Sequence, residues 1–171
     1  MKSLKPIIIT GFMASGKSMV TGALARILNR EAVDLDQVIT GQEGRTPKEI
    51  IEQNGEAAFR ETETRVLRDV LKNRSAAVIA LGGGAWTVQR NRDLIAEHDG
   101  FTVWLDAPFE LCWQRIAAAG GERPLARDEA QARTLYEERR RVYQLAKLHV
   151  AGEDLKNVDK LASDIAEALR T

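Results

Sequence analysis

The stretch Gly11-Phe12-Met13-Ala14-Ser15-Gly16-Lys17-Ser18 decides the fold, because it fits the phosphate-binding pattern G-x-x-x-x-G-K-[ST]. The apolar run Ile7-Ile8-Ile9 precedes it, and apolar residues at helical spacing follow it. A buried strand, a glycine loop and a helix in this order predict a P-loop, and they disfavour the alternative of an ordinary glycine turn before a helix. The loop's N–H groups would surround a polyphosphate, with Lys17 neutralising phosphate oxygens and Ser18 ligating Mg²⁺.

Short apolar segments alternate with longer amphipathic segments along the rest of the chain. We predict strands at 6–10, 32–35, 76–81, 101–105 and 148–151. We predict helices at 17–29, 47–53, 56–73, 88–97, 109–118, 129–146 and 157–170. This alternation is typical of a doubly wound α/β fold, in which helices cover both faces of a parallel sheet.

Length and composition narrow the classes of partner. A chain of 171 residues predicts a single domain with a sizeable core. Lys+Arg and Asp+Glu number 25 each, so the zero net charge indicates small-molecule partners rather than nucleic acid or an anionic membrane. The single cysteine, Cys112, indicates a reducing compartment. No segment fits a signal peptide or a membrane span, so we expect a cytoplasmic protein, and we expect a monomer.

Three charged residues lie on helix faces that should be buried. Arg60 and Glu63 lie on or beside the apolar stripe of the helix at 56–73, and Arg139 lies on the stripe of the helix at 129–146. Isolated buried charges are unfavourable, so such residues have partners or line a cleft. Two inward arginines predict a pocket for an anionic substrate, since guanidinium groups bind carboxylates bidentately. A purely structural Arg60–Glu63 pair is the alternative.

Polar and glycine residues follow two predicted strands. Alternation places Asp34 and Asp36 on one face at the carboxyl end of the sheet, where one could orient hydrated Mg²⁺ and the other a substrate hydroxyl. Helix capping by Asp36 is the alternative. Gly82-Gly83-Gly84 follows the strand at 76–81, and three glycines let backbone N–H groups approach a ligand closely. A loose strand-to-helix turn is the alternative there.

The stretch 117–128 differs from the rest of the chain. It contains small residues, the pair Gly120-Gly121 and the arginines Arg123 and Arg127 between two predicted helices. In a phosphate-binding fold, a glycine-containing loop with arginines predicts a lid, and a plain solvent loop is the alternative.

Taken together, six motifs in order resemble the shikimate kinase family over nearly the whole chain. They are the P-loop Gly11–Ser18, Asp34-x-Asp36, Gly55-Glu56-x-x-Phe59-Arg60-x-x-Glu63, Gly82-Gly83-Gly84, Arg123-Pro124-Leu125 and Arg139-x-x-x-Tyr143-x-x-Ala146. The resemblance implies a fold like that of nucleoside monophosphate kinases, with five parallel strands in the order 2-3-1-4-5 and a lid. It also implies one domain over residues 1–171, with substrate-binding helices at about 36–63 and the lid at about 117–128.

The resemblance further implies the reaction, which is transfer of the γ-phosphoryl group of MgATP to the 3-hydroxyl of shikimate in aromatic amino acid biosynthesis. The ATP-binding residues would be Gly11, Ala14, Ser15, Gly16, Lys17, Ser18, Met19, Arg115 and Arg123, with Arg115 stacking on adenine. The substrate-binding residues would be Asp36, Arg60, Glu63, Gly82, Gly83, Gly84 and Arg139. Lys17, Asp36 and Arg123 would be catalytic, Ser18 would bind Mg²⁺ directly, and Asp34 would bind it through water.

The chain departs from the family pattern at three positions, and other functions stay open. Ala14 replaces a loop glycine, Met19 a threonine, and Ile51 a phenylalanine beside the substrate. The alternatives are a gluconate-type kinase, a nucleotide kinase, and a P-loop ATPase or switch module. Asp106, at the end of the predicted strand 101–105, would be the Walker B carboxylate of such an ATPase.

Overall fold

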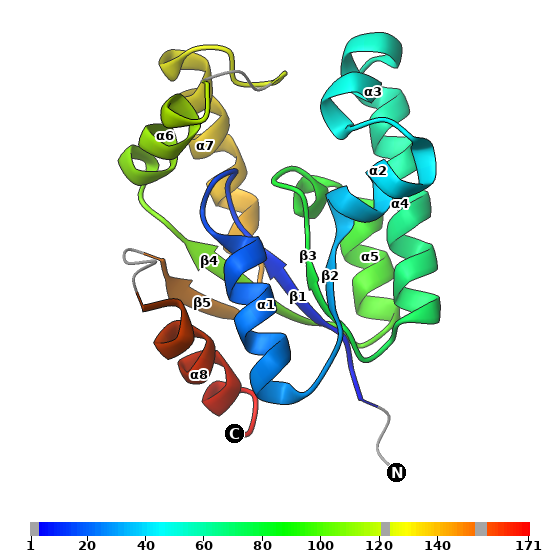
Figure 1. Cartoon of the computed structure of the whole chain (residues 1–171), viewed down its shortest axis with the longest axis vertical. Coiled ribbons are helices and arrows are strands. Elements are labelled where there is room, and N and C mark those ends of the chain that lie inside the picture. The colour runs from blue at the N-terminus through cyan, green and yellow to red at the C-terminus, as the bar shows by residue number, and fades with distance from the viewer. Residues whose placement is uncertain (1–3, 121–123, 153–156) are drawn as a thin grey trace.

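The computed structural model describes residues 4–120, 124–152 and 157–171, and within these residues one parallel sheet forms the centre of the molecule (Figure 1). Its strands are β1 (Ile7–Thr10), β2 (Ala32–Asp34), β3 (Val78–Ala80), β4 (Phe101–Asp106) and β5 (Leu148–Ala151). They lie in the order β2-β3-β1-β4-β5, which confirms the predicted order.

Strand β1 lies at the centre of the sheet, and both of its faces are buried. Ile8 pairs with Ile79 of β3 and with Thr102 of β4, so β1 has a neighbour on each side. Ile7 and Ile9 point into one core and Ile8 into the other, as the alternation of side chains along a strand requires. A strand buried on both faces reads as a continuous apolar run, which is the pattern seen in the sequence.

Helices α1 (Lys17–Leu28) and α8 (Val158–Ala168) cover one face of the sheet, where Val20, Leu24 and Ile165 pack against β1 (Figure 1). The other core takes side chains from the remaining helices. These are α2 (Leu35–Glu43), α3 (Pro47–Asn54), α4 (Glu56–Asn73), α5 (Gln89–Glu97), α6 (Phe109–Ala118), α7 (Glu129–Tyr143) and the short 3₁₀ helix η1 (Ala85–Thr87). No helix in the described ranges is both long enough and apolar enough to cross a membrane.

Helix α2 corrects the prediction for the region after β2. The predicted strand 32–35 ends at Asp34, and α2 begins at Leu35. Asp34, not Asp36, is the N-cap, because its Oδ1 accepts hydrogen bonds from the backbone N–H groups of Asp36 (3.1 Å) and Gln37 (3.3 Å). The two aspartates therefore do not share a strand face. Asp36 lies in the first turn of α2.

Helix α7 is shorter than predicted. The apolar stripe continues to Ala146, but the helix ends at Tyr143, and residues 144–146 form hydrogen-bonded turns. The backbone N–H of Lys147 then donates to Thr102 Oγ1 (3.0 Å) and leads the chain into β5. The stripe persists beyond the helix because Ala146 is buried in the same core.

Candidate active site

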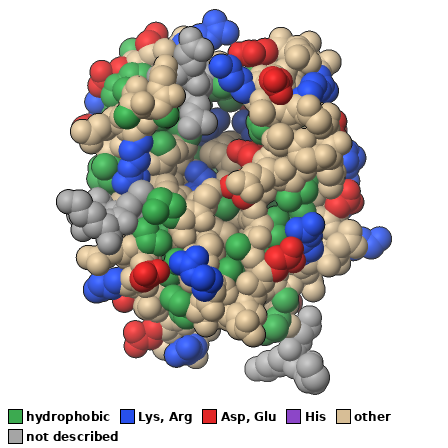
Figure 2. Space-filling view, in the orientation of Figure 1, with side chains coloured by type: hydrophobic (Ala, Val, Ile, Leu, Met, Phe, Trp, Pro, Cys, Tyr) green, Lys and Arg blue, Asp and Glu red, His purple; other side chains and the backbone are tan. Residues whose placement is uncertain are grey.

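Two adjoining cavities lie at the carboxyl edge of the sheet, and the space-filling view shows a hollow with basic side chains inside it in the upper half of the molecule (Figure 2). The arginine cavity is lined by Met13, Asp36, Pro47, Ile51, Phe59, Arg60, Glu63, Gly82, Gly83, Gly84, Pro124, Leu125 and Arg139. The P-loop cavity is lined by Met13, Ala14, Gly16, Lys17, Ser18, Met19, Asp34, Asp36, Leu81, Gly82 and Gly83. They share Met13, Asp36, Gly82 and Gly83, so a ligand in one cavity can reach a ligand in the other.

The P-loop places a half-buried cation, Lys17, in the P-loop cavity. Gly16 is the N-cap of α1 and adopts a left-handed conformation with φ 99°, which glycine tolerates well. Lys17 Nζ donates to the carbonyls of Gly11 (3.0 Å) and Phe12 (2.8 Å). Burial lowers the pKa of Lys17 to about 8, and the nearby carboxylate of Asp36 opposes that shift. The helix N-terminus and this ammonium group form an anion site suited to phosphate.

Ala14 of the P-loop and Arg115 of α6 are far apart in the sequence but in contact in the structure. Ala14 has a φ of 60°, in the left-handed region that a family glycine would occupy with less strain. Its carbonyl accepts a hydrogen bond from Arg115 Nη1 (2.9 Å), so Arg115 lies against the P-loop. This placement is compatible with an adenine contact, which stays a prediction.

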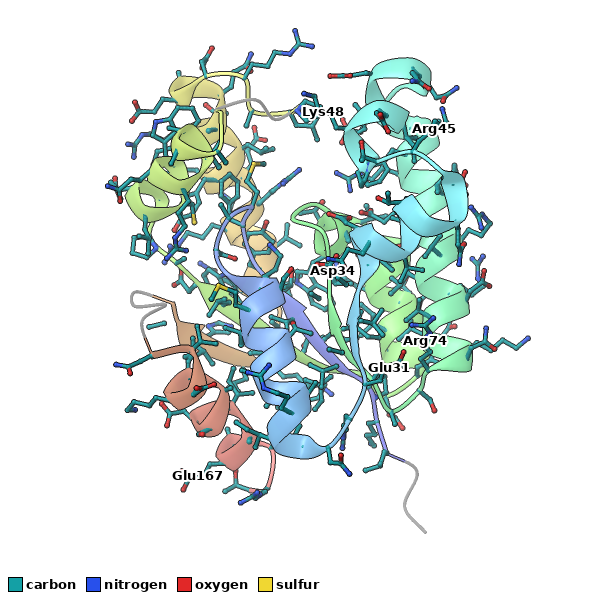
Figure 3. All side chains as sticks on the ribbon, viewed as in Figure 1. Glu31, Asp34, Arg45, Lys48, Arg74 and Glu167 are labelled. Atoms are coloured by element: carbon teal, nitrogen blue, oxygen red, sulfur yellow. The ribbon has the colours of Figure 1, made fainter. Side chains whose placement is uncertain are left out.

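Ser18 and Asp34 place two oxygen ligands side by side at the edge of the P-loop cavity. Ser18 Oγ donates to Asp34 Oδ2 at 2.6 Å, and Figure 3 shows Asp34 where β2 passes into α2. Hydroxyl, carboxylate and phosphate oxygens with water are the ligands that Mg²⁺ prefers. These residues therefore fit the predicted Mg²⁺ site.

Helix α4 directs an arginine and its partner toward the arginine cavity. Arg60 Nη1 donates to Glu63 Oε1 at 2.8 Å, so the structural pair considered from the sequence exists, and the same arginine also lines the cavity. Glu63 is fully buried. Burial raises the pKa of Glu63 to about 7, although the neighbouring guanidinium group of Arg60 counteracts that shift.

Arg139 of α7 enters the arginine cavity from the opposite side. It is 7% exposed, and burial lowers the pKa of its guanidinium group. A buried guanidinium group needs anionic or hydrogen-bonding partners, and Arg139 faces Arg60 across the same cavity, so the two arginines together indicate a site for an anionic ligand. Helical spacing correctly predicted that Arg60, Glu63 and Arg139 point inward.

The three glycines after β3 leave room for these charged side chains. A methyl group at Gly82 would lie 2.8 Å from Asp36 Oδ1, and one at Gly83 would lie 3.1 Å from Arg139 Nη1. A methyl group at Gly84 would collide with Arg60 Nη2. A side chain at Gly82 or Gly84 would thus force a charged group to shift, and one at Gly83 would crowd Arg139.

The sequence predicted only part of the apolar lining of the arginine cavity: Ile51 was expected beside the substrate and lines the cavity, whereas Pro47 and Met13 were not expected there. Pro47 and Phe59 come from α3 and α4, and Met13 stands between the two cavities. Pro47 follows Thr46, whose capping box with Glu49 starts α3, and this signal was present in the sequence. The predicted lid is described in part: Pro124 and Leu125 line the cavity, whereas Arg123 lies outside the described residues.

Comparison with known proteins agrees with this arrangement. A family model described as shikimate kinase matches residues 13–170. The shikimate kinase of Cereibacter sphaeroides is 39% identical, covering 98% of this chain and 83% of that protein, and the one from a Sulfurihydrogenibium species is 34% identical, covering 98% and 99%. The chain belongs to the shikimate kinase family. The resemblance predicted from the six motifs is thereby confirmed.

Solved structures of the family have the same fold. A structure of shikimate kinase from Acinetobacter baumannii in complex with shikimate superimposes with a TM-score of 0.89 and 32% identity, covering 98% of this chain and 94% of that one. A gluconokinase from Sinorhizobium meliloti reaches a TM-score of 0.60 with 17% identity, so it shares the fold alone. The predicted α/β class of P-loop kinases is confirmed.

Arg140 of α7 is held by an ion pair. Its guanidinium group binds both carboxylate oxygens of Asp106, at 3.1 and 3.2 Å. Arg140 also lies over the ring of Trp104, 5.2 Å from the centroid. This residue therefore ties α7 to the end of β4.

Proposed function

We propose that this chain transfers the γ-phosphoryl group of ATP to the 3-hydroxyl of shikimate, giving shikimate 3-phosphate and ADP. The observation that carries the proposal is the shared boundary of the two cavities, at which a phosphate held by the P-loop would meet an acid held by two arginines. Such a step belongs to aromatic amino acid biosynthesis. We place it in a cytoplasmic monomer that binds no nucleic acid or membrane.

The two ligands are held by different parts of the site. The P-loop residues Gly11, Ala14, Ser15, Gly16, Lys17, Ser18 and Met19 bind ATP together with Arg115 and Arg123. Arg60 and Arg139 bind the carboxylate of shikimate, and Gly82, Gly83 and Gly84 contribute backbone donors. Glu63 holds Arg60 in place through their 2.8 Å contact. This division keeps the acid and the polyphosphate in separate cavities.

Positioning and neutralisation of charge do most of the catalytic work in phosphoryl transfer. Asp36, at the boundary, orients the attacking hydroxyl, while Lys17 and Arg123 stabilise charge on the transferring group. Mg²⁺ held by Ser18 directly and by Asp34 through water would neutralise β- and γ-phosphate oxygens. Residues 1–171 form one domain in this scheme, with substrate-binding helices at about 36–63 and a lid at about 117–128.

The alternative of a P-loop ATPase or switch is disfavoured by the contacts of Asp106. A Walker B carboxylate holds the nucleotide's Mg²⁺. Arg140 instead occupies both oxygens of Asp106. A gluconate-type or nucleotide kinase would share the fold, so the acceptor must be identified by assay.

The test is ADP release with MgATP and one acceptor at a time: shikimate, gluconate, AMP, CMP or UMP, with products identified by phosphorus NMR. We expect turnover with shikimate alone and a 3-phosphate product. Turnover with another acceptor would reassign the arginine cavity. Acceptor-independent hydrolysis as the main activity would refute the proposed function.

A further inference from the structure

Tyr143, the last residue of α7, lies outside the arginine cavity and contacts residues that form its wall. The side chain is 1% exposed, and its hydroxyl donates to the carbonyl of Gly83 at 2.5 Å. Burial raises the pKa of Tyr143, and the guanidinium group of Arg139, one helical turn earlier, opposes that rise. Arg139 also packs against the same glycine, since a methyl group at Gly83 would lie 3.1 Å from its Nη1. One buried hydroxyl is thus bonded to Gly83 and interacts with Arg139, and both residues line the cavity.

The bond to Gly83 also orients the next peptide group. The peptide that links Gly83 to Gly84 is planar and trans, so fixing the carbonyl of Gly83 fixes the direction of the N–H of Gly84. Glycine backbones have more conformational freedom than others, and three in succession need an external restraint to hold one geometry. Tyr143 supplies that restraint.

A second bond keeps α7 and the glycine loop in register. Trp86 Nε1, in η1 directly after the glycines, donates to the carbonyl of Val142 at 3.0 Å. The ring of Trp104 packs beside Tyr143 with centroids 6.0 Å apart. Tyr143 is absent from the described residues that line either cavity, so any effect on a ligand passes through its neighbours.

We propose that Tyr143 is a positioning residue for acid binding: its hydroxyl sets the guanidinium group of Arg139 and the Gly83–Gly84 peptide in the geometry that receives a carboxylate. The inference rests on the proposed function, because it assumes that the arginine cavity binds shikimate. It adds a residue whose role is to hold two substrate contacts at a fixed separation. Removal of the hydroxyl alone should loosen both contacts while leaving the packing of the ring unchanged.

Tyr136 provides a matched control on the same helix. Its hydroxyl also donates to a backbone carbonyl, that of Ala107 (2.8 Å), and accepts from an arginine, Arg140 (2.9 Å). It is likewise buried, at 6% exposed. Tyr136→Phe and Tyr143→Phe therefore each remove a buried hydroxyl that donates to a backbone carbonyl, and only the Tyr143 hydroxyl is bonded to the wall of the arginine cavity.

The experiment is steady-state kinetics of the full chain and both variants with shikimate and with its methyl ester, which lacks the carboxylate charge. In Tyr143→Phe we expect KM for shikimate to rise about tenfold, as for loss of a hydrogen bond that orients a charged group, with kcat and KM for ATP nearly unchanged. With the methyl ester, Tyr143→Phe should match the wild type. Tyr136→Phe should leave KM for shikimate unchanged.

Thermal melting shows whether each variant is folded. Shikimate binding, measured by tryptophan fluorescence, gives the affinity even if a variant turns over slowly. An unchanged affinity for shikimate in folded Tyr143→Phe would overturn the proposal, as would an equal loss with the methyl ester or in Tyr136→Phe. A wild-type chain that does not phosphorylate shikimate would instead refute the proposed function.

Discussion

At the scale of single residues, we expect the protonation of Lys17 to control nucleotide binding. Burial lowers its pKa from the ordinary 10.5 to about 8, although two carbonyls accept hydrogen bonds from its ammonium group. Only the charged form neutralises phosphate, so ADP affinity should be constant below about pH 8 and fall by up to about tenfold per pH unit above it. Isothermal titration calorimetry over this range measures the affinity.

The lowered pKa of Lys17 also makes the stability of the fold depend on pH, in the opposite direction to the ADP affinity. Between about pH 8 and the ordinary value of 10.5, the unfolded chain holds a proton on Lys17 that the folded chain has lost. Its contribution to the free energy of unfolding therefore rises with pH in that window. Lys17→Met, which cannot titrate, should abolish the Lys17 part of both pH dependences. An ADP affinity that stays flat through the window would contradict the expectation.

Arg60 depends on the shape of its side chain as well as its charge. The guanidinium group binds Glu63 with Nη1 and lies against Gly84 with Nη2, an arrangement that an ammonium group cannot reproduce. Arg60→Lys should weaken shikimate binding by about 2 kcal/mol, seen as an increase in KM. Arg65→Lys, on the same helix but exposed and paired with Glu43, is the control and should bind normally. Equal KM values in the two variants would leave Arg60 with a structural role alone.

At the scale of elements, Asp34 caps a helix and also lies at the predicted metal site. Its Oδ1 caps α2, which carries Asp36, and its Oδ2 accepts from Ser18 Oγ. Asp34→Ala should cost about 1 kcal/mol of stability, whereas Asp34→Asn keeps a good capping oxygen and should cost less. Both variants should need more Mg²⁺ for half-maximal activity, because both lose the negative charge.

Denaturant unfolding and Mg²⁺ titration of activity separate these two roles. An Asp34→Asn variant with a normal Mg²⁺ requirement would remove Asp34 from the predicted metal site. If Asp34→Ala were as stable as the wild type, the cap would contribute nothing measurable to α2.

The elements also show how far the sequence predicts the site. Period-3.6 patterns gave the inward direction of Arg60, Glu63 and Arg139, because the misplaced charges stood out against an apolar stripe. Helix α2 was missed because Val33 to Asp36 also fits the alternation of a strand. Asp34 caps the beginning of this helix, and Gly44, in a left-handed conformation, ends it. Aspartate and glycine at these two positions are helix start and stop signals that the sequence already contained. Tyr143 could not be assigned a role, since its partner Gly83 lies 60 residues away.

At the scale of the whole molecule, the two cavities must act as one during transfer. Helices α2, α3 and α4 stand on one side of the carboxyl edge of the sheet, and α6 and α7 stand on the other (Figure 1). The predicted lid at 117–128 connects α6 to α7, so its closure would exclude water from both ligands at once. Arg60 and Arg139 come from opposite sides of this opening, and acid binding would thereby draw the sides together.

The lid arginine offers the sharpest test of this coupling. If Arg123 neutralises charge only during transfer, Arg123→Ala should lower kcat by about 10²-fold or more while ADP binds within a few-fold of normal. Arg127→Ala, an exposed arginine of the same segment, is the matched control and should keep its turnover. Rapid-quench measurement of phosphoryl transfer isolates the chemical step from product release. A transfer rate in Arg123→Ala close to that of Arg127→Ala would mean that the lid closes over the site without contributing charge. Lys17 and Mg²⁺ would then stabilise the transferring phosphoryl group without Arg123.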